Sequence, residues 1–183
     1  FNGSSFARTC ALTGAGSRFA FKSRALADYA GKQFVKEYEL WMMPVNAAES
    51  AKAPKTAYIG TAGFTGDIKA RVKTFEDACA LVGEDPEDYK FSDGEPDEIA
   101  YRKLKVIAKA LNNGWFPDWN NDGQLKWYPW FYLNSPGFRF CGSSFASTDA
   151  STGSGSRLRF ASEELATYAG KQFIDLFRDY MTL

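Results

Sequence analysis

The sequence predicts an α+β fold in which a complete α-β-β-β-α unit with an antiparallel sheet is joined to an incomplete copy of itself. Three observations support this prediction: an internal repeat, helical spacing of apolar residues, and an aromatic-rich stretch typical of a hairpin. The expected organisation is an incomplete strand-helix copy over residues 1–45, a linker with room for a short strand over 46–74, and the complete unit over 75–183.

The internal repeat covers Gly16–Phe34, which returns as Gly155–Phe173 in constant register. Both copies begin Gly-Ser-Arg and end Tyr-Ala-Gly-Lys-Gln-Phe. The match extends upstream, where Phe1–Ala7 corresponds to Phe140–Ala146. A repeat of this kind has to be settled before any fold is assigned. We therefore expect both copies to adopt the same local structure.

Each copy is predicted to form a short strand, a serine cap and a helix. In the first copy these are residues 16–21, Ser23 and a helix to about Trp41. The second copy repeats them over residues 156–161, with Ser162 as the cap. Serine is a favoured N-cap because its side-chain oxygen accepts a hydrogen bond from an otherwise unpaired helix N–H. Apolar residues four apart give the first helix one apolar side: Leu26, Ala30, Phe34 and Tyr38.

Both repeat helices contain an internal glycine, Gly31 and Gly170. A glycine inside a helix costs about 1 kcal/mol relative to alanine. Its presence in both copies indicates close approach of another backbone, such as the counterpart helix. We therefore consider self-association through the repeat helices, residues 24–41 and 163–180.

Two further helices and a hairpin precede the second copy. Thr74 is predicted to cap a helix over Phe75–Val82, which Gly83 ends. A longer helix is expected over Pro96–Asn112, with proline at the favoured first position. The following aromatic residues indicate a strand over 126–133, with Pro129 at an edge or bulge, and a partner strand that begins at Phe138. These aromatic side chains form either core or a stacking platform for bases or sugars, and we favour core.

The segment upstream of each predicted repeat strand differs between the copies with a period of two. Ala7, Thr9, Ala11 and Thr13 recur in the second copy, whereas the residues between them are replaced. In an extended strand this spacing separates two faces. One face is then a fixed scaffold, and the other either drifts on a solvent-exposed side or varies to bind a ligand. The candidate binding residues are Arg8, Cys10, Leu12, Ser147, Asp149 and Ser151.

The composition excludes several classes of function. The chain has no histidine, which removes Ser-His-Asp and Cys-His catalysis and most zinc sites. Asp118-x-Asn120-x-Asp122-Gly123 matches the start of a calcium loop, but Lys126 and Pro129 stand where later ligands belong. We expect no metal, no cofactor and no enzymatic activity. No apolar stretch is long enough for a membrane span.

The three cysteines, Cys10, Cys79 and Cys141, lack the spacing of a metal site, and the repeat does not double any of them. We interpret them as free thiols, which favours a cytoplasmic or virion-associated location.

Nucleic-acid binding is the alternative function. Lys+Arg and Asp+Glu are both 22, so the net charge is zero. Phosphate groups could then bind only to a local patch of basic residues. The candidate contacts are Arg102, Lys105, Lys109, Arg157 and Lys171. The order α-β-β-β-α is also that of double-stranded RNA-binding domains. However, the last helix here begins Ser162-Glu163-Glu164, which is acidic where such a domain places lysines on phosphate.

The sequence also resembles a family of uncharacterised proteins from gut Bacteroidota and from their phages and mobile elements. The resemblance covers roughly residues 75–183, with the tail seen again at 1–40. It is carried by Phe75-Glu76-Asp77-Ala78-Cys79, Trp115-Phe116-Pro117-Asp118-Trp119-Asn120, Trp127-Tyr128-Pro129-Trp130-Phe131 and the Gly155–Phe173 repeat.

Members of that family differ from one another in the stretch that matches Gly142–Ser154. This pattern is similar to that of binding proteins diversified by retroelements, although the lectin-like signature of those proteins is missing. The resemblance therefore implies a non-enzymatic binding or structural module of phage or mobile-element origin. Such a module would present a variable extended segment on a fixed scaffold to a protein or surface ligand.

Overall fold

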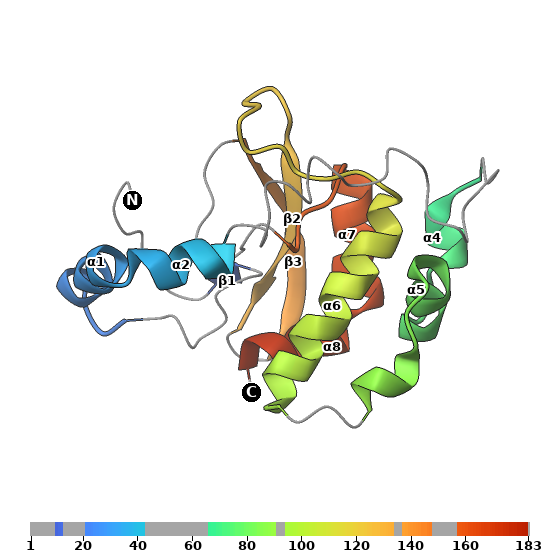
Figure 1. Ribbon diagram of the computed structural model, residues 1–183, viewed down its shortest axis with the longest axis horizontal. Helices are drawn as coiled ribbons and strands as arrows, with labels where there is room; N and C mark the ends of the chain where they lie inside the picture. Colours follow the sequence, from blue (N-terminus) through green and yellow to red (C-terminus); the bar gives the residue numbers. More distant parts are fainter. Residues whose placement is uncertain are drawn as a thin grey trace.

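The computed structural model describes residues 10–12, 21–42, 66–90, 94–133, 137–147 and 157–182, and structural statements below concern these residues. It has the predicted α+β character (Figure 1). The elements in chain order are β1 (Cys10–Leu12), α1 (Arg24–Gln33), α2 (Val35–Met42), α4 (Ile68–Arg71), α5 (Phe75–Val82), the 3-10 helix η2 (Pro86–Tyr89), α6 (Pro96–Asn112), β2 (Lys126–Tyr132), β3 (Arg139–Ala146), α7 (Glu163–Gln172) and α8 (Ile174–Thr182).

The sheet is antiparallel, with strand order β1-β2-β3. β2 and β3 pair along their length, from Lys126 opposite Ala146 to Tyr132 opposite Arg139, with a bulge next to Trp130. β1 pairs with the last residues of β2 on its other side. The first repeat copy therefore completes the sheet that is built mainly from the second.

The predicted third strand, residues 156–161, differs from the structure: in the described part of the chain it is reduced to one bridge between Phe160 and Trp127. The backbone on either side of Phe160 bonds to a side chain instead. Asn112, at the end of α6, donates from Nδ2 to the carbonyl of Arg159 at 2.6 Å and accepts at Oδ1 from the N–H of Ala161 at 3.0 Å. The chain then turns directly into α7, so no length remains for a regular strand.

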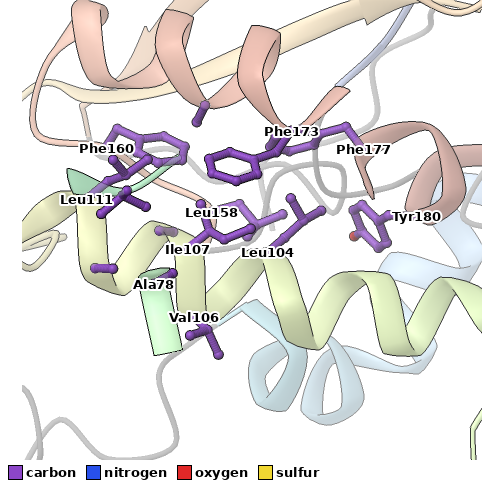
Figure 2. Close-up of a cluster of buried hydrophobic side chains, with 14 of the residues drawn as sticks. Ala78, Leu104, Val106, Ile107, Leu111, Leu158, Phe160, Phe173, Phe177 and Tyr180 are labelled. Atoms are coloured by element: carbon purple, nitrogen blue, oxygen red, sulfur yellow. The ribbon is translucent and has the colours of Figure 1, made fainter. Parts of the chain in front are cut away.

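The helices α4 to α8 lie on one side of the sheet (Figure 1). α7 contacts β2 and β3, α8 packs against α6, and α5 covers another side of α6. Figure 2 shows the core between them, where Leu104, Ile107 and Leu111 of α6 face Phe160, Phe173 and Phe177. The core therefore lies almost entirely within residues 66–182.

Both repeat helices, which were predicted to be continuous, break at the same phenylalanine. Phe34 has φ −111° and ψ 37°, and Phe173 has φ −112° and ψ 31°. Neither helix contains a proline that could cause the break. Because the break has the same backbone angles in both copies, we attribute it to the sequence that they share. In the second copy its consequence is clear: α7 lies on the hairpin while α8 follows α6. A straight helix would not follow both surfaces.

The predicted helix starts are confirmed. Ser23 and Ser162 each accept a hydrogen bond from the N–H three residues later, at 3.3 Å in both copies. Thr74 and Asp77 form a reciprocal capping box that starts α5. Gly83 ends α5 with φ 77°, a left-handed conformation that favours glycine.

The close approach predicted for the internal glycine occurs, but against the hairpin and not against the counterpart helix. A Cβ atom at Gly170 would lie 2.7 Å from Pro129 Cβ and 2.7 Å from the ring of Phe140. Any larger residue would push α7 off the sheet. Gly31 is also buried in the first copy.

No helix in the described ranges is both long enough and apolar enough to cross a membrane.

Candidate functional site

The structure places the two predicted binding segments at opposite edges of one sheet. Cys10 and Leu12 belong to β1, and Ser147 directly follows β3. The other three candidates, Arg8, Asp149 and Ser151, lie outside the described residues. Cys10 and Leu12 have the extended conformation that was predicted, whereas Ser147 lies in a bend just after β3.

The outer edge of β3 carries backbone groups that no described strand pairs with. Trp127 exchanges both backbone hydrogen bonds with Phe160, at 3.0 and 2.8 Å, so its N–H and C=O point away from β3. Residues of an antiparallel pair alternate between bonding across the ladder and facing away from it. Phe145, opposite Trp127, and Ser143, opposite Pro129, therefore turn their backbone groups away from β2. Pro129 removes no hydrogen bond from the β2–β3 ladder, because an N–H at this position would point away from β3.

Side chains of β3 anchor the strand and leave its end exposed. Ser143 Oγ lies 2.9 Å from Thr167 Oγ1 of α7. Arg139 covers the ring of Tyr132 at 4.5 Å. Phe145 contacts the ring of Trp127, with centroids 5.0 Å apart, yet it is 51% exposed. The edge therefore combines a fixed backbone with an accessible aromatic side chain.

Four of the five predicted nucleic-acid contacts line one hollow of about 510 Å³, which also contains acidic groups: Arg102, Lys105, Lys109 and Arg157 with Glu84 and Asp88. Lys109 pairs with Glu84 at 3.3 Å. Burial lowers the pKa of Lys105, and the neighbouring Arg157 and Arg102 lower it further. The hollow therefore combines four basic groups with two acidic ones, and Glu84 already pairs with Lys109.

The fifth contact, Lys171, lies elsewhere. Its Nζ is 5.5 Å from the ring centroid of Phe140, and it lines a different hollow of about 680 Å³ beside α4. That hollow is mixed in charge, because Asp67, Glu163 and Glu164 line it too. The structure therefore separates Lys171 from the other four predicted contacts.

The calcium-like loop contains a lysine ammonium. Lys126 is fully buried, and its Nζ donates to the carbonyls of Asn121 at 2.8 Å and Gln124 at 2.7 Å. Asp118 accepts from the N–H of Asn120 at 3.0 Å, which makes it a turn residue. No group of three acidic, cysteine or histidine side chains suited to a metal occurs in the described ranges. The ammonium supplies the positive charge to which the loop carbonyls bond.

Arg159 is a buried charge that the sequence did not reveal. Its guanidinium lies 4.3 Å from the ring centroid of Tyr128 and 5.5 Å from that of Trp119. Burial lowers its pKa to about 10, against the opposing effect of Tyr128. Part of the aromatic cluster thus holds cations, while Phe131 belongs to the core. The first repeat has Ala20 at this position, so comparing the copies could have drawn attention to it.

Of the cysteines, Cys79 is buried in α5 and Cys141 is half-buried in β3, and both are free thiols. Burial, followed by the charge of Glu84, raises the pKa of Cys79 to about 11. Cys79 is therefore protonated at neutral pH and unsuited to nucleophilic chemistry.

The helix pair α1–α2 exposes large apolar side chains: Phe21, just before it, and Leu26, Tyr29, Phe34 and Val35. Figure 1 shows this pair (blue) on the side of the sheet away from α4 to α8. Contiguous exposed apolar surface commonly marks an interaction site.

Searches of protein-family models, of curated proteins and of solved structures gave no match to this chain.

Proposed function

We propose that this protein is a non-enzymatic binding module that takes up an extended segment of a partner protein at the outer edge of β3. The observation that carries the proposal is the outward direction of the Ser143 and Phe145 backbone groups. An extended segment laid along β3 would pair with these groups and add a strand to the sheet. Strand addition of this kind draws affinity from backbone hydrogen bonds and specificity from alternate side chains.

The sequence of β3 favours this use. Exposed sheet edges are commonly protected by lysine, proline or inward-pointing charges, since an open edge invites pairing with other chains. β3 is eight residues long, and its only charged residue is Arg139 at the start. It contains no proline. An edge of this length without such protection is a liability unless a partner uses it.

Of the variable residues that the structure describes, Ser147 would supply specificity next to this edge, whereas Cys10 and Leu12 lie at the opposite edge of the sheet. Ser147 follows β3 directly. In this proposal Ser147 and the other five candidates, Arg8, Cys10, Leu12, Asp149 and Ser151, differ among related proteins while the scaffold stays fixed. Sequencing many related genes tests the idea, since substitutions spread evenly along the chain would contradict it.

A proline at position 143 tests strand addition directly. It would remove the outward N–H while leaving the β2–β3 ladder intact, because that N–H does not take part in it. Ser143→Ala is the matched control, since it too loses the contact with Thr167 but keeps the N–H. We expect peptides selected from a displayed library of random 12-residue sequences to bind the wild type and the alanine variant. Binding to Ser143→Pro should weaken about tenfold, as expected for a lost hydrogen bond at an interface.

Two results of this selection would contradict the proposal. The first is a library that yields no binder to the wild type. The second is a set of peptides that bind Ser143→Pro as tightly as Ser143→Ala. Circular dichroism of all three proteins establishes that they have the same fold.

Nucleic-acid binding is the second candidate, favoured by the gathering of Arg102, Lys105, Lys109 and Arg157 around one hollow. A generic RNA duplex should then bind at low salt, with affinity that falls steeply as salt rises. Arg102→Ala should weaken this binding, whereas Lys171→Ala, in the other hollow, should not. Failure of the wild type to bind at low salt would eliminate this candidate.

A further inference from the structure

The mixed-charge hollow beside α4 opens along the outer edge of β3. Two of the residues that line this hollow of about 680 Å³ also contact β3. Thr167 Oγ1 lies 2.9 Å from Ser143 Oγ, and one helical turn later Lys171 Nζ lies 5.5 Å from the ring centroid of Phe140. α7 therefore follows the edge of the sheet, in the direction opposite to that of β3.

The lining residues of α7 lie on the flank of the helix toward this open edge. The buried face of α7 comprises Ala166, Ala169 and Gly170. Thr167 and Lys171 each follow one of these residues, about 100° further around the helix. Tyr168 holds α4 as the far wall, since its Oη donates to the carbonyls of Lys69 at 3.0 Å and Val72 at 2.7 Å. A strand added to β3 would therefore lie across the opening of the hollow.

The pairing with β3 determines which side chains of an added strand would enter the hollow. Residues directly opposite one another in a sheet have their side chains on the same face, and residues two apart along a strand share a face. Ser143 faces α7 through its contact with Thr167. The added residue opposite Ser143, and those two positions before and after it, would therefore point toward α7. Two strand residues span about 6.6 Å and one helical turn about 5.4 Å, so these three side chains would meet three successive turns of α7.

The charge along these turns of α7 changes sign from one end to the other. Glu163 and Glu164 line the hollow at the first turn, and Lys171 lines it at the third. Lys69 and Asp67, across the hollow, pair with each other at 3.6 Å and so offset one another. The two carboxylates outweigh the positive end of the helix dipole, which is equivalent to about half a charge. The hollow therefore offers a negative end and a positive end to an added strand.

We propose that the segment taken up at β3 carries a basic residue and an acidic residue four positions apart. The segment runs antiparallel to β3, the direction that is slightly more stable per residue. The basic residue then comes first, opposite Phe145, and its side chain points toward Glu163 and Glu164. The acidic residue lies beyond Ser143 and pairs with Lys171. This inference rests on strand addition at β3 and adds the chemistry of the partner.

Reversing the charge of Lys171 tests the assignment with the displayed library of random 12-residue sequences. Peptides selected on the wild type should be enriched in lysine or arginine followed, four positions later, by aspartate or glutamate. Selection on Lys171→Glu should replace that acidic residue with a basic one. Wild-type peptides should bind Lys171→Glu about fivefold more weakly, because an attractive exposed pair becomes a repulsive one.

The first repeat copy provides the matched control. Lys32 has the position in α1 that Lys171 has in α7, and both side chains are exposed. Lys32→Glu changes the net charge of the chain by the same amount but lies outside the hollow. It should bind the selected peptides as tightly as the wild type does. Circular dichroism of both variants should match that of the wild type.

The outcomes distinguish this inference from the proposed function. Peptides that require the N–H of Ser143 but show no charge pattern would overturn the inference and leave strand addition in place. The same holds for peptides in which the acidic residue comes first, and for peptides that bind Lys171→Glu as tightly as Lys32→Glu. A library that yields no binder to the wild type would overturn both.

Discussion

Asn112 shows how one side chain can take the place of a strand. Its amide bonds to the backbone on both sides of Phe160, at 2.6 and 3.0 Å, while Trp127 bonds to Phe160 itself. A side chain that both donates and accepts is required, because one contact is to a carbonyl and the other to an N–H. The chain between the predicted variable segment and α7 is therefore held at this point.

Replacing Asn112 should destabilise the fold. Asn112→Ala leaves two partly buried backbone groups without this partner and should lower the free energy of unfolding by about 2–3 kcal/mol. Asn112→Asp should not rescue it, because an oxygen would then face the carbonyl of Arg159. Urea denaturation measures both, with the exposed Asn120→Ala as a control expected to change stability by less than about 0.5 kcal/mol. A full rescue by aspartate would show that only the bond to Ala161 matters.

At the scale of elements, the chain provides a matched pair of helix caps. Ser23 and Ser162 bond to their helices with the same geometry, but α7 packs into the core whereas α1 is largely exposed. Ser162→Ala should therefore lower the global free energy of unfolding by about 1 kcal/mol. Ser23→Ala should instead leave the main urea transition unchanged and reduce helicity only in α1. Equal shifts of the main transition would mean that both helices unfold with one core.

Local sequence signals predicted where the helices begin and end, but not which segments pack against one another. Thr74, Gly83 and Pro96 mark helix ends through backbone hydrogen bonding and backbone geometry, which act within a few residues. The reduction of the third strand depends on Asn112, which is distant in sequence, and the close contact of Gly170 is with the hairpin. Such long-range contacts leave no periodic pattern in the sequence.

The same contrast between local signals and long-range contacts holds for the candidate sites. Alternation between the repeat copies predicted extended segments, and the described parts are strands at the sheet edges except for Ser147, which lies in a bend. The gathering of four basic residues around one hollow depends on how Arg157 lies relative to α6, which spacing along the chain does not specify. The buried positions of Lys126 and Arg159 were missed, because a charged residue beside aromatic residues looks the same in sequence whether its head is solvated or enclosed.

At the scale of the molecule, one core contains most of the buried apolar side chains that the structure describes. Its members lie within residues 66–182, and the described part of the first repeat copy adds only Ala30, Gly31 and Tyr38 to the buried set. Free energies of local opening follow local burial, from near zero at exposed elements to the global value in the core. The first repeat copy should therefore open far more readily than the second, although the two copies share the serine cap and the Tyr-Ala-Gly-Lys-Gln-Phe ending.

Native-state hydrogen exchange tests this difference within a single chain. Amides of α1 should exchange with an opening free energy several kcal/mol below that of the corresponding amides in α7, since only α7 is enclosed by the hairpin and α6. Intrinsic helix propensity cannot produce such a gap, because the two sequences share the same cap and the same Tyr-Ala-Gly-Lys-Gln-Phe ending. Equal protection would require α1–α2 to be covered in solution.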